Sequence, residues 1–227
     1  VQATMAQAAV NAGRDPGEIT LCAATKVQTD DTIRAAIAAG VPVCGENRVQ
    51  ELTAHLEHNA YEGARVHFIG HLQTNKVKQV VGKVELIHSV DSLHLLQAIN
   101  NQADKLGLIQ DFLLEVNIAG EESKGGCTPE LAWELARQSA QLDHVRFRGL
   151  MAIPPVSTVP GENRPWFRAM HQLFVDMREK MSDNQGDITY LSMGMSGDYA
   201  DAIAEGSTLI RVGTALFGPR PPMVPRK

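Results

Sequence analysis

The chain has 227 residues, which is enough for one well-buried domain and short for two enzymatic ones. Its formal net charge of -5 leaves no basic excess to neutralise phosphates, which argues against a nucleic-acid-binding protein. No apolar stretch approaches the length needed to cross a bilayer, and no signal peptide heads the chain. We therefore expect a cytoplasmic protein without a membrane segment.

Short apolar runs, separated by stretches with helical spacing, predict eight strands. In chain order these runs are Ile19–Ala24, Val41–Cys44, Val66–Ile69, Glu85–Val90, Asp111–Asn117, Arg146–Met151, Thr189–Ser192 and Leu209–Val212.

Residues typical of helix ends predict the helices between these strands. Asp30 or Asp31 is expected to cap a helix that Gly40 stops. Ser92 is expected to cap the helix Leu93–Leu106, which the next glycine closes.

The second half of the chain continues this pattern. Thr128 followed by Pro129 combines an N-cap residue with proline at the first helical position, and predicts a helix over Leu131–Leu142. The stretch Pro154–Arg164 is rich in proline, glycine and polar residues and predicts a long loop. Apolar residues at helical spacing predict another helix over Arg164–Met181.

Eight strands alternating with helices predict an α/β fold, a (β/α)8 TIM barrel formed as one domain over residues 1–227. An open doubly wound sheet is the alternative. In such a barrel the ligand-binding groups gather at the carboxyl ends of the strands. We therefore examined those ends for candidate site residues.

Lys26 follows the first predicted strand. Alternation places Lys26 on the same face as Cys22 and Ala24. Because these two side chains are small, the face below the lysine leaves room for a flat ligand. An ammonium near apolar groups is costly to keep charged, which lowers its pKa and makes the amine a nucleophile. The alternative is a surface lysine at a strand end.

The last two strand ends predict a phosphate site. Ser196 and Gly197 precede a helix N-terminus, where backbone N–H groups are available to an anion. Gly213 and Thr214 follow the eighth strand and open a short segment, as in the phosphate sites of many barrels. These residues also have simpler explanations, since Gly194 and Gly197 are typical of a tight turn and Ser196 of a helix cap.

Arg211, on the eighth strand, is expected to point into the barrel beside these groups. Pairing with a buried carboxylate is the alternative, although no acidic residue lies on its own strand. An amine, an anion site and an inward arginine together suggest pyridoxal 5′-phosphate, which offers an aldehyde, a phosphate and a ring nitrogen. Lys26 would form a Schiff base, and Arg211 would meet the ring nitrogen and keep it neutral, which weakens the cofactor as an electron sink.

Several motifs resemble the pyridoxal phosphate homeostasis protein family. They are Thr25-Lys26, the segment 45–51 (GENRVQE), the segment 67–76 (HFIGHLQTNK), the segment 148–154 (RGLMAIP), the segment 191–196 and the segment 202–218. The resemblance covers nearly the whole chain in the same order. It implies a single-domain barrel similar to the N-terminal domain of alanine racemase (fold type III), with pyridoxal phosphate on Lys26.

The same resemblance implies a protein with little or no turnover, which buffers or delivers vitamin B6 cofactor to recipient apo-enzymes. It places Asn47 beside the cofactor, and His71 and Asn75 at the mouth of the site, where loop hydrogen bonding and a helix cap are the alternatives for these residues. Lys124 matches a lysine common in the family, and we expect it to be a solvated loop charge or a transient second cofactor contact.

Two positions depart from the family pattern. Gln28 stands where relatives often carry a second lysine, which puts in doubt a transfer scheme that needs a neighbouring amine. Gly197 stands where many relatives carry an acidic residue, so the phosphate region is expected to be less negative.

Two enzyme classes remain as alternatives. A pyridoxal phosphate-dependent amino-acid racemase needs a second acid–base group opposite the lysine, usually a tyrosine, and the chain has only Tyr61, Tyr190 and Tyr199. A lysine-dependent aldolase needs no anion site. We therefore predict no catalytic residues and a cofactor-binding set of Lys26, Asn47, Ser196, Gly197, Arg211, Gly213 and Thr214.

The three cysteines, Cys22, Cys44 and Cys127, cannot all pair and match no metal site, so we expect buried thiols, a reducing compartment and no metal. The chain opens at Val1 without a methionine, and native residues before it are expected to be missing. The sequence shows no additional apolar stripe that would need a partner subunit to cover it, which favours a monomer.

Overall fold

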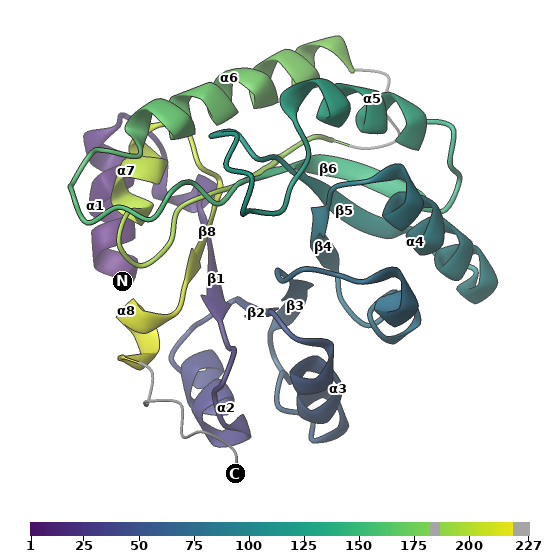
Figure 1. The fold of residues 1–227 in the computed structure, drawn as a ribbon. Coiled ribbons are helices and arrows are strands. Elements are labelled where there is room, and N and C mark those ends of the chain that lie inside the picture. The colour runs from purple at the N-terminus through teal and green to yellow at the C-terminus, as the bar shows by residue number, and fades with distance from the viewer. Residues whose placement is uncertain (182–186, 220–227) are drawn as a thin grey trace.

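The computed structural model describes residues 1–181 and 187–219. Its strands pair in parallel around a closed barrel, in which β1 lies between β2 and β8 (Figure 1). The strands are β1 (Thr20–Ala24), β2 (Val43–Glu46), β3 (Arg65–Phe68), β4 (Leu86–Val90), β5 (Gln110–Glu115), β6 (Val145–Met151), β7 (Tyr190–Ser192) and β8 (Leu209–Val212). The predicted barrel is confirmed, and the open-sheet alternative is wrong.

Helices surround the barrel, and α6 runs along the top of the view in Figure 1. They are α1 (Gln2–Asn11), α2 (Asp30–Ala38), α3 (Val49–Glu57), α4 (Leu93–Leu106), α5 (Pro129–Ser139), α6 (Arg164–Lys180), α7 (Tyr199–Ala204) and α8 (Thr214–Phe217), with short 3-10 helices at Pro16–Glu18 and Thr74–Gln79. Within the described ranges, no helix is long and apolar enough to cross a membrane.

Two predicted caps are confirmed and one is wrong. The Oγ of Ser92 accepts the N–H of Leu95, and Oγ1 of Thr128 likewise caps α5. For α2 the cap is Thr29, whose Oγ1 accepts the N–H of Thr32 at 3.2 Å, rather than Asp30 or the aspartate after it.

Several element ends also differ from the prediction, and β2, β5 and α5 show the largest differences. β2 begins after Pro42, because proline has no N–H to give to the strand ladder, and it extends to Glu46. β5 ends at Glu115, and the next residue forms an isolated bridge with Cys127. α5 ends at Ser139, and the following residues wind more tightly through bonds to the carbonyl three positions back.

The side chains of the strands form two layers of core. Leu21 and Ala23 belong to the large cluster between the strands and the helices, whereas Cys22 and Ala24 belong to a cluster inside the barrel. The two interior clusters consist of Cys22, Ala24, Val43, Ile69 and Leu209, and of Leu86, Leu113 and Met151; Tyr190 packs against both. The alternation predicted for the first strand is therefore confirmed.

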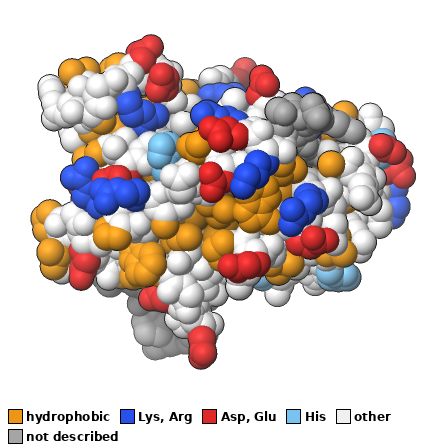
Figure 2. Space-filling model, turned by 90° about the horizontal axis from the view of Figure 1, so that it is seen from above, with side chains coloured by type: hydrophobic (Ala, Val, Ile, Leu, Met, Phe, Trp, Pro, Cys, Tyr) orange, Lys and Arg blue, Asp and Glu red, His pale blue; other side chains and the backbone are white. Residues whose placement is uncertain are grey.

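The surface seen from above carries charges of both signs. In Figure 2, Lys and Arg side chains lie among Asp and Glu side chains, and hydrophobic side chains gather between them near the middle of the view. No single sign dominates this face.

Candidate functional site

A pocket of about 380 Å³ lies at the carboxyl ends of the strands. Its lining consists of Ala24, Lys26, Gln28, Asn47, Ile69, Ile153, Met195, Ser196, Gly197, Arg211, Gly213, Thr214, Phe217 and Gly218. All seven residues of the predicted cofactor-binding set line this one pocket. The structure therefore brings together groups that are up to 188 positions apart in the sequence, from 26 to 214.

Lys26 lies in a tight turn directly after β1. The N–H of Thr25 donates to the carbonyl of Gly45 on β2, and the N–H of Gln28 donates back to the carbonyl of Thr25 at 3.0 Å. Lys26 is thus the second residue of a closed four-residue turn at the rim of the barrel, and its side chain lines the pocket.

Arg211 is almost fully buried, with 5% of its surface exposed. Nη1 donates to the carbonyl oxygen and to Oγ of Ser192, at 2.8 and 2.5 Å, and Nη2 donates to the carbonyl of Ala152 at 2.9 Å. A guanidinium has five N–H groups, so about two remain without an acceptor in the described part of the chain. The predicted inward direction is confirmed, and none of these acceptors is a carboxylate.

The contacts of Arg211 continue through the barrel interior. Ser192 Oγ lies 3.0 Å from Nδ1 of His88, and Nε2 of His88 lies 3.0 Å from Nδ1 of His67. Because arginine only donates, the hydroxyl of Ser192 accepts from it, and the Ser192 O–H finds its own acceptor at Nδ1 of His88. We assign the donors in this direction, so that both imidazoles carry their proton on Nε2 and the hydrogen bonds run from Arg211 toward His67.

The two histidines of this hydrogen-bonded row, His67 and His88, are neutral. Burial lowers the pKa of His67 to about 3 and lowers that of His88 well below its usual value. Nε2 of His67 is buried and has no partner within residues 1–181 and 187–219. Our sequence analysis missed these two residues, although both stand at inward positions of their strands, two residues from Ile69 and from Leu86.

Ser196 holds the start of α8. Its Oγ accepts the N–H groups of Gly213 and Ala215, both at 3.2 Å, so two backbone donors converge on one point of the pocket wall. The alternative of a cap for the helix after it is wrong, because α7 begins after Asp198 and Ser196 bonds to α8 instead. Backbone donors that converge at a helix start are suited to an anion.

The glycines of this region differ in whether a side chain could take their place. Gly194 has φ of +94°, and a Cβ there would lie 2.5 Å from the Cβ of Ala202, so its turn and its packing both need glycine. Gly197 has no atom within 4 Å of an added Cβ, and Gly213 would meet Ala24 only at ordinary contact distance. The tight-turn explanation therefore holds for Gly194, whereas a Cβ at Gly197 would meet open space and one at Gly213 would contact Ala24.

Asn47 supplies an unsatisfied acceptor. Its Oδ1 is buried and has no partner among the described residues, although the side chain lines the pocket. Gly70 allows this position, because a Cβ there would lie 2.0 Å from the carbonyl oxygen of Asn47. An unpaired buried acceptor costs free energy unless a ligand donor meets it.

Three further candidates lie outside the pocket lining. His71 and Asn75 are exposed, in the segment after β3. Lys124 is not a solvated loop charge, since its Nζ donates to the carbonyl of Pro154 at 2.8 Å and pairs with Glu121 at 2.5 Å. That expectation is wrong because the loop folds back on the chain.

The three tyrosines also lie away from the pocket. Tyr61 donates to Glu46, Tyr190 packs inside the barrel and Tyr199 is buried on α7. None of them lines the pocket around Lys26.

Comparison with known proteins gives a consistent result. The family model for the alanine racemase N-terminal domain matches residues 20–221. The pyridoxal phosphate homeostasis protein of Aquifex aeolicus is 42% identical over 94% of this chain and 92% of its own length. The structure of PipY from Synechococcus elongatus with pyridoxal phosphate bound is 34% identical, covers 94% of this chain and 100% of its own, and has a TM-score of 0.81.

A more distant structure agrees in fold alone. Alanine racemase of Clostridium difficile is 14% identical, with a TM-score of 0.68 over 97% of this chain and 57% of its own.

Proposed function

Because the chain belongs to the pyridoxal phosphate homeostasis protein family, we propose that it binds pyridoxal 5′-phosphate in the pocket around Lys26 and holds it without a committed reaction. The observation that carries this proposal is the union, in one pocket, of an amine, a buried arginine and converging backbone donors. We take residues 1–227 as one domain, of which 182–186 and 220–227 lie outside the described residues.

Each residue has a defined task in this proposal. The amine of Lys26 would hold the cofactor aldehyde covalently, and Ser196, Gly213 and Thr214, at the start of α8, would bind its phosphate. The unsatisfied Oδ1 of Asn47 and the unused N–H groups of Arg211 are available to the ring. Open space at Gly197 gives the phosphate room.

Bound pyridoxal phosphate supplies an electron sink whose strength depends on a protonated ring nitrogen. Arg211 only donates hydrogen bonds and gives up its proton with difficulty, so it meets the ring nitrogen as a donor and leaves it neutral. This supports storage or delivery of the cofactor over carbanion chemistry.

The direct test is covalent capture. Protein incubated with pyridoxal phosphate should gain a visible absorption band, and borohydride reduction followed by mass spectrometry should locate the label on Lys26. Lys26→Ala should remove the band completely and keep the circular dichroism spectrum, whereas Lys83→Ala, at an exposed site, should behave like the original protein. A colourless protein would favour the aldolase alternative.

A racemase of the same barrel type is the second candidate function, favoured by the fold that the chain shares with alanine racemase. Against it, no tyrosine lines the pocket to serve as the second acid–base group. Robust racemisation of common amino acids by the loaded protein would overturn the proposal of a non-catalytic holder.

The proposal extends to the cellular setting. We place the protein in the cytoplasm as a monomer that passes cofactor to recipient apo-enzymes. All three cysteines are buried free thiols, and burial raises the pKa of Cys22, Cys44 and Cys127 to about 12, so they stay protonated. Size-exclusion chromatography with light scattering tests the monomer.

A further inference from the structure

The turn that carries Lys26 is strained. Val27 has φ of +61°, and among the described residues only Val27 and Asn59 combine a side chain with positive φ. Asparagine tolerates this conformation, whereas a β-branched residue there is an outlier that persists only when its surroundings enforce it. The residue next to the proposed cofactor lysine is therefore held in place by something outside the turn.

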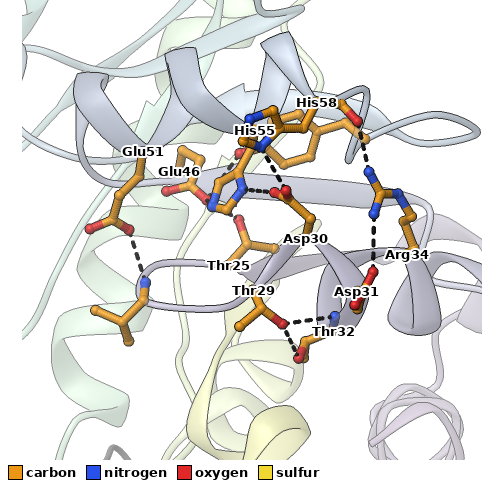
Figure 3. A network of polar contacts seen from close by, with 12 residues as sticks. Thr25, Thr29, Asp30, Asp31, Thr32, Arg34, Glu46, Glu51, His55 and His58 are labelled. Atoms are coloured by element: carbon orange, nitrogen blue, oxygen red, sulfur yellow. Dashed lines mark hydrogen bonds and ion pairs between the residues drawn. The ribbon is translucent and has the colours of Figure 1, made fainter.

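Glu51 supplies that restraint. Its Oε2 accepts the N–H of Val27 at 2.9 Å (Figure 3). Its Oε1 lies 3.3 Å from Nη1 of Arg48. Glu51 stands in the first turn of α3, so the strained residue is tied to a helix that belongs to the next β/α unit. The side chain of Glu51 is 23% exposed, so it is not one of the fully buried side chains of the core.

A second glutamate holds the other side of Lys26. Oε1 of Glu46 accepts the hydroxyl of Thr25 at 2.5 Å and that of Tyr61 at 3.0 Å, and Oε2 lies 3.3 Å from the N–H of Asn47. Glu46 is fully buried, and burial raises its pKa, an effect that the bonds from Thr25 and Tyr61 oppose. One carboxyl group thus contacts the residue before the lysine and a second residue of the pocket.

The two helices beside the turn are also tied together. His55 and His58 of the α3 region contact the two carboxylate oxygens of Asp30, at 2.5 and 2.7 Å, and Asp30 begins α2 (Figure 3). The segment from Thr25 to α2 is therefore fixed at both ends.

We propose that Glu51 and Glu46 are positioning residues, which hold the strained turn Thr25–Gln28 in the conformation that presents the amine of Lys26 to the pocket. The role toward pyridoxal phosphate rests on the proposed function. Without Glu51, Val27 relaxes toward negative φ, and the backbone that carries the lysine turns with it. Phosphate and ring contacts come from other strands and stay in place.

The test compares four variants of the whole chain. Glu51→Ala removes the restraint, Glu51→Gln keeps an acceptor oxygen, and Glu51→Ala with Val27→Gly removes the strain as well, because glycine adopts positive φ freely. Glu57→Ala, at an exposed glutamate of the same helix, is the matched control. Three measurements are made: hydrogen exchange of the Val27 amide in cofactor-free protein, affinity for pyridoxine 5′-phosphate, which has no aldehyde, and covalent capture of pyridoxal phosphate.

Glu51→Ala should lose protection of the Val27 amide and capture pyridoxal phosphate about tenfold more weakly, with unchanged affinity for pyridoxine phosphate. Glu51→Gln and the double variant should recover most of the capture. The proposal is overturned if Glu51→Ala leaves exchange and capture unchanged, if both ligands weaken together, or if the double variant stays as weak as Glu51→Ala. If the original protein captures no pyridoxal phosphate, the proposed function fails, and the exchange measurement alone decides whether Glu51 holds the turn.

Discussion

At the scale of single residues, Arg211 is the best-defined group of the pocket. Its position depends on Ser192, which contributes two of its three acceptors, and Ser192 in turn contacts His88. A side chain that is held by three bonds keeps one orientation, and so the direction of its unused N–H groups is also fixed.

Ser192→Ala tests this dependence. The variant takes one acceptor from Arg211 and the donor from Nδ1 of His88, so we expect about tenfold weaker binding of pyridoxal phosphate and a change in the nitrogen-15 signals of His88. Ser89→Ala is the control, because Ser89 is equally buried and its Oγ has no partner in the described chain. Equal effects of the two variants would contradict the assigned chain of hydrogen bonds.

The residue scale also shows where sequence reasoning was sufficient. Alternation oriented Lys26 and Arg211 correctly toward one pocket, and Ser196 was found from its place in the loop after the seventh strand. Glu46 and His88 were missed because their significance depends on partners from other strands, Thr25 and Ser192, which no local pattern reveals.

At the scale of elements, the cap of α2 illustrates the same limit. Asp30 is a good cap by its local signal, but its carboxylate is engaged by His55 and His58 from α3, and Thr29 takes the capping position. Caps with no such competitor, as at Ser92 and Thr128, were predicted correctly.

Thr29→Ala should lower the free energy of unfolding by about 1 kcal/mol, as measured by urea denaturation, because it leaves the N–H of Thr32 without its acceptor. Asp31→Ala should change it by less than about 0.5 kcal/mol, since Asp31 makes only an exposed ion pair with Arg34. If Asp31→Ala lowered the free energy of unfolding more than Thr29→Ala, Asp31 rather than Thr29 would be the residue that caps α2.

At the scale of the whole molecule, alternating strands and helices were enough to predict a closed barrel, because a parallel strand order of this length has few other solutions. The interior of the barrel was less predictable. A chain of polar side chains crosses it between aliphatic clusters, and the two histidines of that chain must remain neutral for the fold to persist.

This requirement predicts a pH dependence of stability. Burial lowers the pKa of His67 to about 3, whereas a histidine of the unfolded chain titrates near about 6.5. Between these values the unfolded chain binds more protons than the folded one, so the free energy of unfolding falls as the pH falls. His67→Gln removes this contribution.

Urea denaturation at pH 7 and pH 5 measures the effect. Between pH 7 and pH 5 the free energy of unfolding should fall by about 2 kcal/mol more in the original protein than in His67→Gln. This figure follows from about 1.4 kcal/mol for each pH unit below the pKa of histidine in the unfolded chain. His94→Gln, at an exposed histidine, should follow the original protein. An identical loss in His67→Gln and the original protein would show that folding does not lower the pKa of His67.

The row of donors from Arg211 to His67 has one more consequence, which concerns proton movement. Linked side chains of this kind often conduct protons, each group passing one on as it receives another. Here the first member has no lone pair on which to receive a proton, and the last is an imidazole that resists protonation. This row of side chains therefore insulates rather than conducts, and it gives a proton from the pocket no path toward His67.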